Sequence, residues 1–220
     1  MYNLLSQGLQ EQRLPNIFVS YAHVDNKPFS GEEKGWVTHF VNNLRNEVNR
    51  KMGREENYSL WMDFRLKGSD ELTPELEKQV SQADTLLLFL SPGWLASKWC
   101  RRELEIFTGA PAKQHSGQVF VVEADSLETT RKPEVLRDCL GYRLWEKTDE
   151  DRIRKLGYPV PRPDWQEHSK YFTRLFDLSQ DLANRLQDIA GDAPATTPGT
   201  KATVYVAYSR TRFWLTARSP

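Results

Sequence analysis

The sequence has little cysteine and no excess of either charge. Its 220 residues hold 30 Lys and Arg against 30 Asp and Glu, so no net field favours nucleic acid or an anionic membrane. Only Cys100 and Cys139 are present, which argues against a disulfide framework and fits a reducing compartment. No apolar run reaches membrane-span length, and the first 15 residues lack a signal-peptide layout. We therefore expect a cytoplasmic protein with no nucleic-acid or membrane partner.

Three common catalytic and nucleotide-binding signatures are also missing. The chain contains no G-x-S-x-G elbow, no Walker-type loop and no G-x-G-x-x-G. Hydrolase-triad, P-loop and conventional dinucleotide-fold interpretations therefore lack their signatures. The 39% hydrophobic and 11% aromatic residues are nevertheless enough for a sizeable core.

Strand and helix patterns alternate along the chain. Apolar, β-branched runs predict strands at 16–23, 58–64, 85–90, 118–124 and 141–145. Helical spacing of apolar residues predicts helices at 35–51, 73–82 and 97–108, and a last helix that reaches about residue 189. This alternation indicates an α/β sheet with right-handed crossovers. The run 85–90 is apolar throughout, as a central strand covered on both faces should be.

The composition predicts one domain over residues 14–190, preceded by an N-terminal tail at 1–13. Residues 191–201 read as a flexible linker because they are rich in Gly, Pro, Ala and Thr. Residues 202–220 begin like a strand with no partner left to pair with. We interpret them as a tail or as the start of a truncated second module.

Polar residues follow several of the predicted strands. In open α/β sheets, ligands bind in the crevice at the carboxyl ends of the strands. The candidate binding residues at these exits are Ser20, Tyr21, Ala22, His23, Trp61, Asp63, Arg65, Lys67, Gly68 and Ser91.

Trp99 and Glu103 come next, on the predicted helix after 85–90. If Ser97 caps that helix, the two side chains stand one turn apart on one face. One offers a flat aromatic surface and the other a carboxylate. The ordinary alternatives are that Trp99 only packs and that Glu103 is a solvated charge or half of an ion pair.

Other candidate groups have simpler explanations. His23 and Asp25 suggest a metal but lack a third ligand. Cys100 reads as a small buried residue because no His stands near it in the sequence. Arg65 and Lys67 are also compatible with an ordinary solvated loop.

Taken together, four stretches resemble a Toll/interleukin-1 receptor (TIR) domain of the bacterial type. In order, they are "IFVSYAHVD", "LWMDFRLKGSDELTPEL", "ADTLLLFLSPGWLASKWCRREL" and "VFVVEAD". They resemble the family's first box, its second strand with the following BB loop, its W-C-x-x-E segment and its fourth strand. The resemblance covers roughly residues 14 to 190.

The resemblance implies a flavodoxin-like open parallel sheet of about five strands flanked by helices. It also implies NAD+ hydrolase activity, with NAD+ as substrate and no metal or other cofactor. The family's catalytic glutamate falls on Glu103, and Trp99 contributes to the nucleotide pocket. Tyr21 to His23 and the BB loop carry further contacts. Some members have basic residues just after the first-box Tyr, where this chain has Ala22 and His23.

This chemistry is compatible with a single carboxylate. In NAD+ the nicotinamide ring is a cationic pyridinium, and it leaves as a neutral molecule. No general acid therefore has to protonate it, whereas the leaving oxygen of an ordinary glycoside must be protonated. Glu103 would hold the ribose and stabilise the developing positive charge. Trp99 or Tyr21 would stack on a ring, Arg65 or Lys67 would neutralise the pyrophosphate, and Ser91 would position the ribose.

Two other functions remain open from the sequence. A non-catalytic TIR adaptor would act by TIR–TIR interaction through the loop around Leu66–Gly68 and would not need Glu103. A nucleoside-processing enzyme with a similar sheet would use a carboxylate in the same way but would not explain the W-C-x-x-E spacing.

For the hydrolase we expect self-association, and a sensor subunit or domain as a further partner in bacterial defence. The product, ADP-ribose or a cyclic ADP-ribose, stays open.

Overall fold

A five-stranded parallel sheet organises the chain. The computed structural model describes residues 14–53, 58–62, 74–109, 119–137, 139 and 141–191. The strands are paired in the order β2-β1-β3-β4-β5. Their bounds are β1 Asn16–Ser20, β2 Ser59–Met62, β3 Thr85–Leu90, β4 Val119–Glu123 and β5 Gly141–Arg143. This open sheet between helices confirms the predicted fold class.

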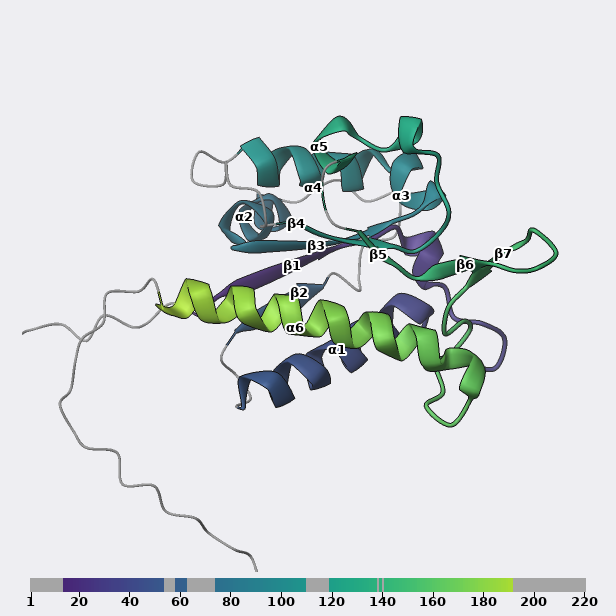
Figure 1. Cartoon of the computed structure of the whole chain (residues 1–220). Helices are drawn as coiled ribbons and strands as arrows, with labels where there is room; N and C mark the ends of the chain where they lie inside the picture. Colours follow the sequence, from purple (N-terminus) through teal and green to yellow (C-terminus); the bar gives the residue numbers. More distant parts are fainter. Residues whose placement is uncertain are drawn as a thin grey trace, which may run out of the picture.

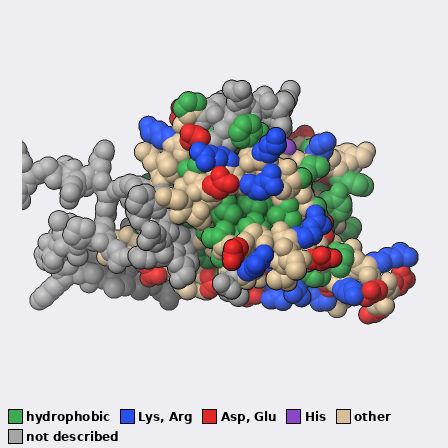
Figure 2. Space-filling model, turned by 90° about the horizontal axis from the view of Figure 1, so that it is seen from above, with side chains coloured by type: hydrophobic (Ala, Val, Ile, Leu, Met, Phe, Trp, Pro, Cys, Tyr) green, Lys and Arg blue, Asp and Glu red, His purple; other side chains and the backbone are tan. Residues whose placement is uncertain are grey.

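Helices cover both faces of the sheet (Figure 1). One face carries α1 (Trp36–Met52) and α6 (Ser169–Gly191), which pack side by side. The opposite face carries α2 (Pro74–Gln82), α3 (Pro92–Ala96), α4 (Lys98–Gly109) and α5 (Glu134–Arg137). Figure 2 looks onto this second layer, where hydrophobic side chains gather near the centre and charged side chains lie around them.

Strand β3 shows why both layers are needed. All six of its residues are buried. Leu87 and Phe89 belong to the core beneath α1 and α6, whereas Leu86, Leu88 and Leu90 belong to the core beneath α2 and α4. Successive side chains of a strand point to opposite faces, so a strand covered on both sides reads as one continuous apolar run.

Several predicted boundaries differ from the structure. The first strand ends at Ser20, Tyr21 and Ala22 lie in neither a strand nor a helix, and a 3-10 helix, η1 (His23–Asn26), begins at the last residue of the predicted range. The predicted strand 141–145 stops at Arg143, and Trp145 begins an antiparallel hairpin of β6 (Trp145–Lys147) and β7 (Ile153–Lys155). Helix α3 was not predicted, and residue 191, expected in the linker, belongs to α6. No helix within the described ranges is long and apolar enough to cross a membrane.

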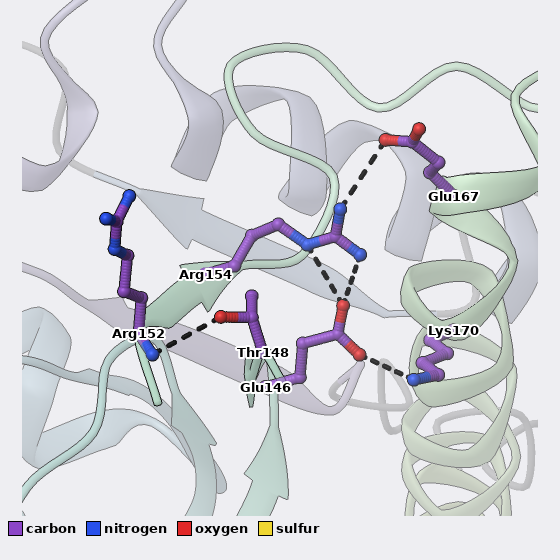
Figure 3. Close-up of polar contacts among 6 residues, drawn as sticks. All are labelled: Glu146, Thr148, Arg152, Arg154, Glu167 and Lys170. Carbon is purple, nitrogen blue, oxygen red and sulfur yellow. Dashed lines mark hydrogen bonds and ion pairs between the residues drawn. The ribbon is translucent and has the colours of Figure 1, made fainter. Parts of the chain in front are cut away.

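The β6–β7 hairpin projects from one end of the sheet and is tied to α6 by charged side chains (Figures 1 and 3). The Glu146 carboxylate accepts hydrogen bonds from Arg154 on β7 and, at 2.5 Å, from Lys170 on α6. Arg154 also reaches Glu167, 3.5 Å away. The hydrogen bonds from Lys170 and Arg154 hold the pKa of Glu146 below its ordinary value.

We expect Glu146→Gln to destabilise the protein by about 1 kcal/mol at pH 7, because it removes the negative charge that Arg154 and Lys170 contact and leaves one acceptor oxygen in place of two. Since the folded-state pKa of Glu146 is lowered, the difference from wild type should be fully present above about pH 5. It should shrink as the pH falls through the lowered value. Urea unfolding at pH 7 and at pH 3 to 4 measures it.

Glu150→Gln is the matched control on the same hairpin. Glu150 pairs with Arg152 at 3.4 Å, but both side chains are more than 70% exposed, so little change is expected. Equal unfolding midpoints for Glu146→Gln and wild type at pH 7 would contradict the anchoring role.

Candidate functional site

A pocket of about 490 Å³ opens at the carboxyl end of β1, between the chain that follows this strand and helices α3 and α4. This is the edge of the sheet where ligands bind in open α/β folds, and the volume lies within the usual range for small-molecule sites. The pocket is lined by Phe18, Val19, Tyr21, Ala22, His23, Val24, Gly93, Ala96, Ser97, Lys98, Trp99, Cys100 and Glu103.

Glu103 reaches this pocket from the inner face of α4. The buried residues of this helix are Cys100, Glu103, Leu104 and Phe107, which follow the helical spacing of a core-facing stripe. A carboxylate therefore occupies a position of the kind normally filled by an apolar residue, and Glu103 is only 8% exposed. A buried carboxylate is costly unless hydrogen bonds compensate it.

The helix start that was predicted for this segment is confirmed. The Ser97 hydroxyl accepts a hydrogen bond from the backbone N–H of Cys100 at 3.3 Å, as an N-cap does. α4 begins at Lys98, so Trp99 lies one turn before Glu103, and both line the pocket. Trp99 is half-buried.

Two further rings line the pocket from the segment after β1. Tyr21 and His23 line the pocket, and their ring centroids are 5.5 Å apart in a tilted arrangement. Ala22 lies between them and is 5% exposed. The structure therefore brings together Tyr21, Ala22, His23, Trp99 and Glu103, five of the residues that the sequence singled out.

Ser20 sits behind the pocket and touches Glu103 directly. Its hydroxyl donates a 2.5 Å hydrogen bond to Oε2 of Glu103. It also accepts a 3.0 Å hydrogen bond from Nε1 of Trp94 on α3. Ser20 and Trp94 are 1% and 0% exposed. Neither of them lines the pocket, so the Ser20 hydroxyl faces the carboxylate and not the space beside it.

Ser91 caps α3 and does not line the pocket. Its hydroxyl accepts from the backbone N–H of Trp94 at 2.9 Å and donates to the Asp25 carboxylate. Burial raises the pKa of Asp25, although the Ser91 hydroxyl and the nearby Lys155 ammonium favour its charged form. These contacts hold η1, which carries His23, against the start of α3.

The remaining sequence-predicted residues belong to β2 and the segment after it. Trp61 does not line the pocket; it stacks on Phe18 of the neighbouring strand, with centroids 5.1 Å apart. Asp63, Arg65, Lys67 and Gly68 lie outside the described residues.

The pocket does not present a reactive thiolate. Cys100 is 3% exposed, and burial, with the Glu103 carboxylate as a further cause, raises the pKa of its thiol to about 12. The thiol is therefore protonated at neutral pH and a poor nucleophile. Within the described ranges, no three His, Cys, Asp or Glu side chains lie together in a way that could hold a metal ion.

Sequence reasoning missed Trp94 and Gly93. The signal was present, because Ser91-Pro92 is a cap followed by a first-turn proline, which predicts a helix start. A Cβ on Gly93 would lie 2.5 Å from Cγ1 of Val24 and 3.3 Å from Cβ of Ala22. Glycine therefore permits the close approach of α3 to the segment that forms the pocket wall.

Comparison with known proteins identifies the family of this chain. The sequence model of the TIR domain matches residues 17–156. No curated protein gives a significant match. One solved structure that matches is that of a metazoan TIR-STING receptor from C. gigas in complex with 2',3'-cGAMP.

That match has 16% sequence identity and a TM-score of 0.40, and it covers 66% of this chain and 38% of the receptor chain. The family assignment rests on the match to the sequence model of the TIR domain. That match covers more than half of the sequence, including β3 and every residue that lines the candidate pocket. The chain belongs to the TIR domain family.

Proposed function

We propose that this chain is an NAD+ glycohydrolase in which Glu103 is the catalytic residue. TIR domains include both NAD+-cleaving enzymes and adaptors. The observation that carries the proposal is one buried carboxylate, Glu103, in a pocket that also contains the rings of Tyr21, His23 and Trp99. An adaptor has no need of this arrangement, whereas a site for a cationic nucleotide uses both the charge and the rings.

The reaction breaks the bond between C1′ of the ribose and the ring nitrogen of nicotinamide. The bonding electron pair goes to that nitrogen, which loses its positive charge, and positive charge develops on the ribose. Glu103 would stabilise that charge electrostatically and hold the ribose hydroxyls. Water then attacks C1′ and releases one proton, so that NAD+ and water give nicotinamide, ADP-ribose and H+. Attack by the adenine ring in place of water would give a cyclic ADP-ribose.

The aromatic walls would bind the substrate rings. Trp99 stands on the α4 side of the pocket and Tyr21 on the β1 side. Stacking on such faces is favourable for any heteroaromatic ring. On the basis of the sequence, Arg65 or Lys67 would neutralise the charge of the pyrophosphate. The proposal requires no metal and no bound cofactor besides the substrate.

Self-association and a regulatory setting belong to the same proposal. TIR domains commonly associate with one another, and the resemblance to bacterial members suggests an enzyme that is switched on by assembly in defence signalling. A sensor domain or subunit would supply the trigger.

Replacing Glu103 by Gln should lower the rate of nicotinamide release by at least about 100-fold, because it removes the negative charge that meets the developing cation. Chromatographic detection of nicotinamide from NAD+ measures this. Glu105→Gln is the control on the same helix, since Glu105 is 68% exposed and pairs only with Arg102 among the contacts resolved for it. Equal rates for Glu103→Gln and wild type would contradict a catalytic Glu103.

Replacing Trp99 by Ala should raise KM for NAD+ by about tenfold and change kcat less, because stacking on one aromatic ring contributes about 1–3 kcal/mol to binding. Initial rates over a range of NAD+ concentrations give both constants. Trp165→Ala is the control, since Trp165 is 48% exposed and lies outside the pocket. An unchanged KM would mean that Trp99 only packs.

The specific activity of the full chain should rise with protein concentration, in parallel with the fraction of associated protein, because assembly would complete the site. Nicotinamide release and sedimentation velocity, measured on the same dilution series, test this together. A specific activity that stays constant while the protein associates would remove assembly from the mechanism. Association without any turnover would favour the adaptor.

A further inference from the structure

We infer that Ser20 and Trp94 are positioning residues that orient the Glu103 carboxylate and keep it ionised. They act through a relay of two hydrogen bonds, and the inference deepens the function proposed above and rests on it. Ser20 was expected to contact the substrate. The structure instead places its hydroxyl between Trp94 and Glu103, away from the pocket surface.

The Trp94 indole fixes the serine oxygen as an acceptor, and the strongest acceptor left for the serine proton is the Glu103 carboxylate. The Cys100 thiol, which also interacts with Ser20, is a weak acceptor. The indole Nε1 of Trp94 can only donate, so Ser20 Oγ must accept along the 3.0 Å contact. The single hydroxyl proton of Ser20 is then available for Glu103 Oε2 at 2.5 Å. A hydroxyl that already accepts a hydrogen bond is polarised and becomes a stronger donor.

Each member of the relay is held by a different element. Ser20 is the last residue of β1, where its side chain points to the same face of the sheet as Phe18. Trp94 is fully buried on α3, and its backbone N–H bonds to the Ser91 cap. Glu103 comes from the second turn of α4. Orientation of the carboxylate by this relay therefore needs all three elements in place.

The relay bears on the charge of Glu103 because a hydrogen bond donated to a carboxylate favours its ionised form. Other titratable groups share the surroundings. Tyr21 and His23 line the pocket from the segment after β1, and Lys98 and Cys100 line it from α4. Asp25 on η1 acts electrostatically on Cys100. On α2, which packs against α4, Glu77 lies 4.0 Å from Arg102. Strands β1 and β3 and helix α3 contain no titratable side chain.

The test is Ser20→Ala, which removes the hydroxyl with little change in volume. In the full chain, the titration midpoint of the Glu103 carboxyl carbon, followed by 13C NMR, should rise by about one pH unit. Glu103→Gln identifies that signal by its loss. In turnover, kcat should fall between about 10- and 100-fold with a smaller change in KM. The acidic limb of the pH–rate profile should move to higher pH.

Trp94→Phe tests the outer half of the relay, and it should move the same midpoint in the same direction by a smaller amount. The double variant should be no worse in kcat than Ser20→Ala alone, because Trp94 acts through Ser20.

Two controls match these changes in burial and chemistry. Ser179→Ala removes a fully buried hydroxyl on α6 that bonds to the carbonyl of Phe176. Trp36→Phe removes a buried indole N–H that bonds to the carbonyl of Leu156. Trp36 on α1 and Ser179 on α6 both lie on the face of the sheet opposite to α3 and α4. Both substitutions should therefore leave the titration midpoint of Glu103 unchanged.

The outcomes separate this inference from the proposed function. A raised midpoint in a protein that releases no nicotinamide would support the relay and overturn the glycohydrolase. Turnover that depends on Glu103 but is unaltered by Ser20→Ala, with an unshifted midpoint, would support the enzyme and overturn the relay. Equal shifts in the controls would also overturn it.

Discussion

The hydrogen bond between Ser20 and Glu103 is the interaction on which the site depends. Glu103 occupies a core position of α4 and is 8% exposed. Removing a carboxylate from water is unfavourable unless polar partners replace the water. Ser20 is one such partner, 2.5 Å away, and it is itself held by Trp94. A charge can therefore be kept in an aromatic pocket, where the reduced exposure to water would strengthen its effect on the cationic substrate proposed above.

Helix α3 links this site to the rest of the sheet edge. Its cap, Ser91, connects to Asp25 on η1, and its Trp94 connects to Ser20 at the end of β1. Lys155, on the hairpin strand β7, acts electrostatically on Asp25, and its ammonium lies 4.4 Å from the Trp36 ring centroid. Thus α3 connects η1 to the end of β1 beside the pocket, and η1 in turn interacts with the hairpin. The buried strand β3, covered on both faces, supports this arrangement from within.

The regular part of the fold could be predicted because periodic apolar spacing reports directly on burial. This holds for 85–90, for the helix after Gly35 and for the helix that begins after Ser97. The same reasoning placed Trp99 and Glu103 on one face, and both line the pocket. The position of a polar residue at the end of a strand does not determine which way its side chain points. Ser91 turns to cap α3, and Ser20 turns to Glu103. The Trp94 contact joins residues 74 positions apart, and no local pattern carries that information.

A crystal structure of the full chain carrying Glu103→Gln with NAD+ bound would test the role of Glu103 most directly, since the substitution should leave the substrate intact. We expect NAD+ in the pocket lined by Trp99 and Tyr21, with the nicotinamide ribose within hydrogen-bond distance of the substituted side chain. NAD+ bound at another part of the surface, with this pocket empty, would contradict the assignment of Glu103 as the catalytic residue.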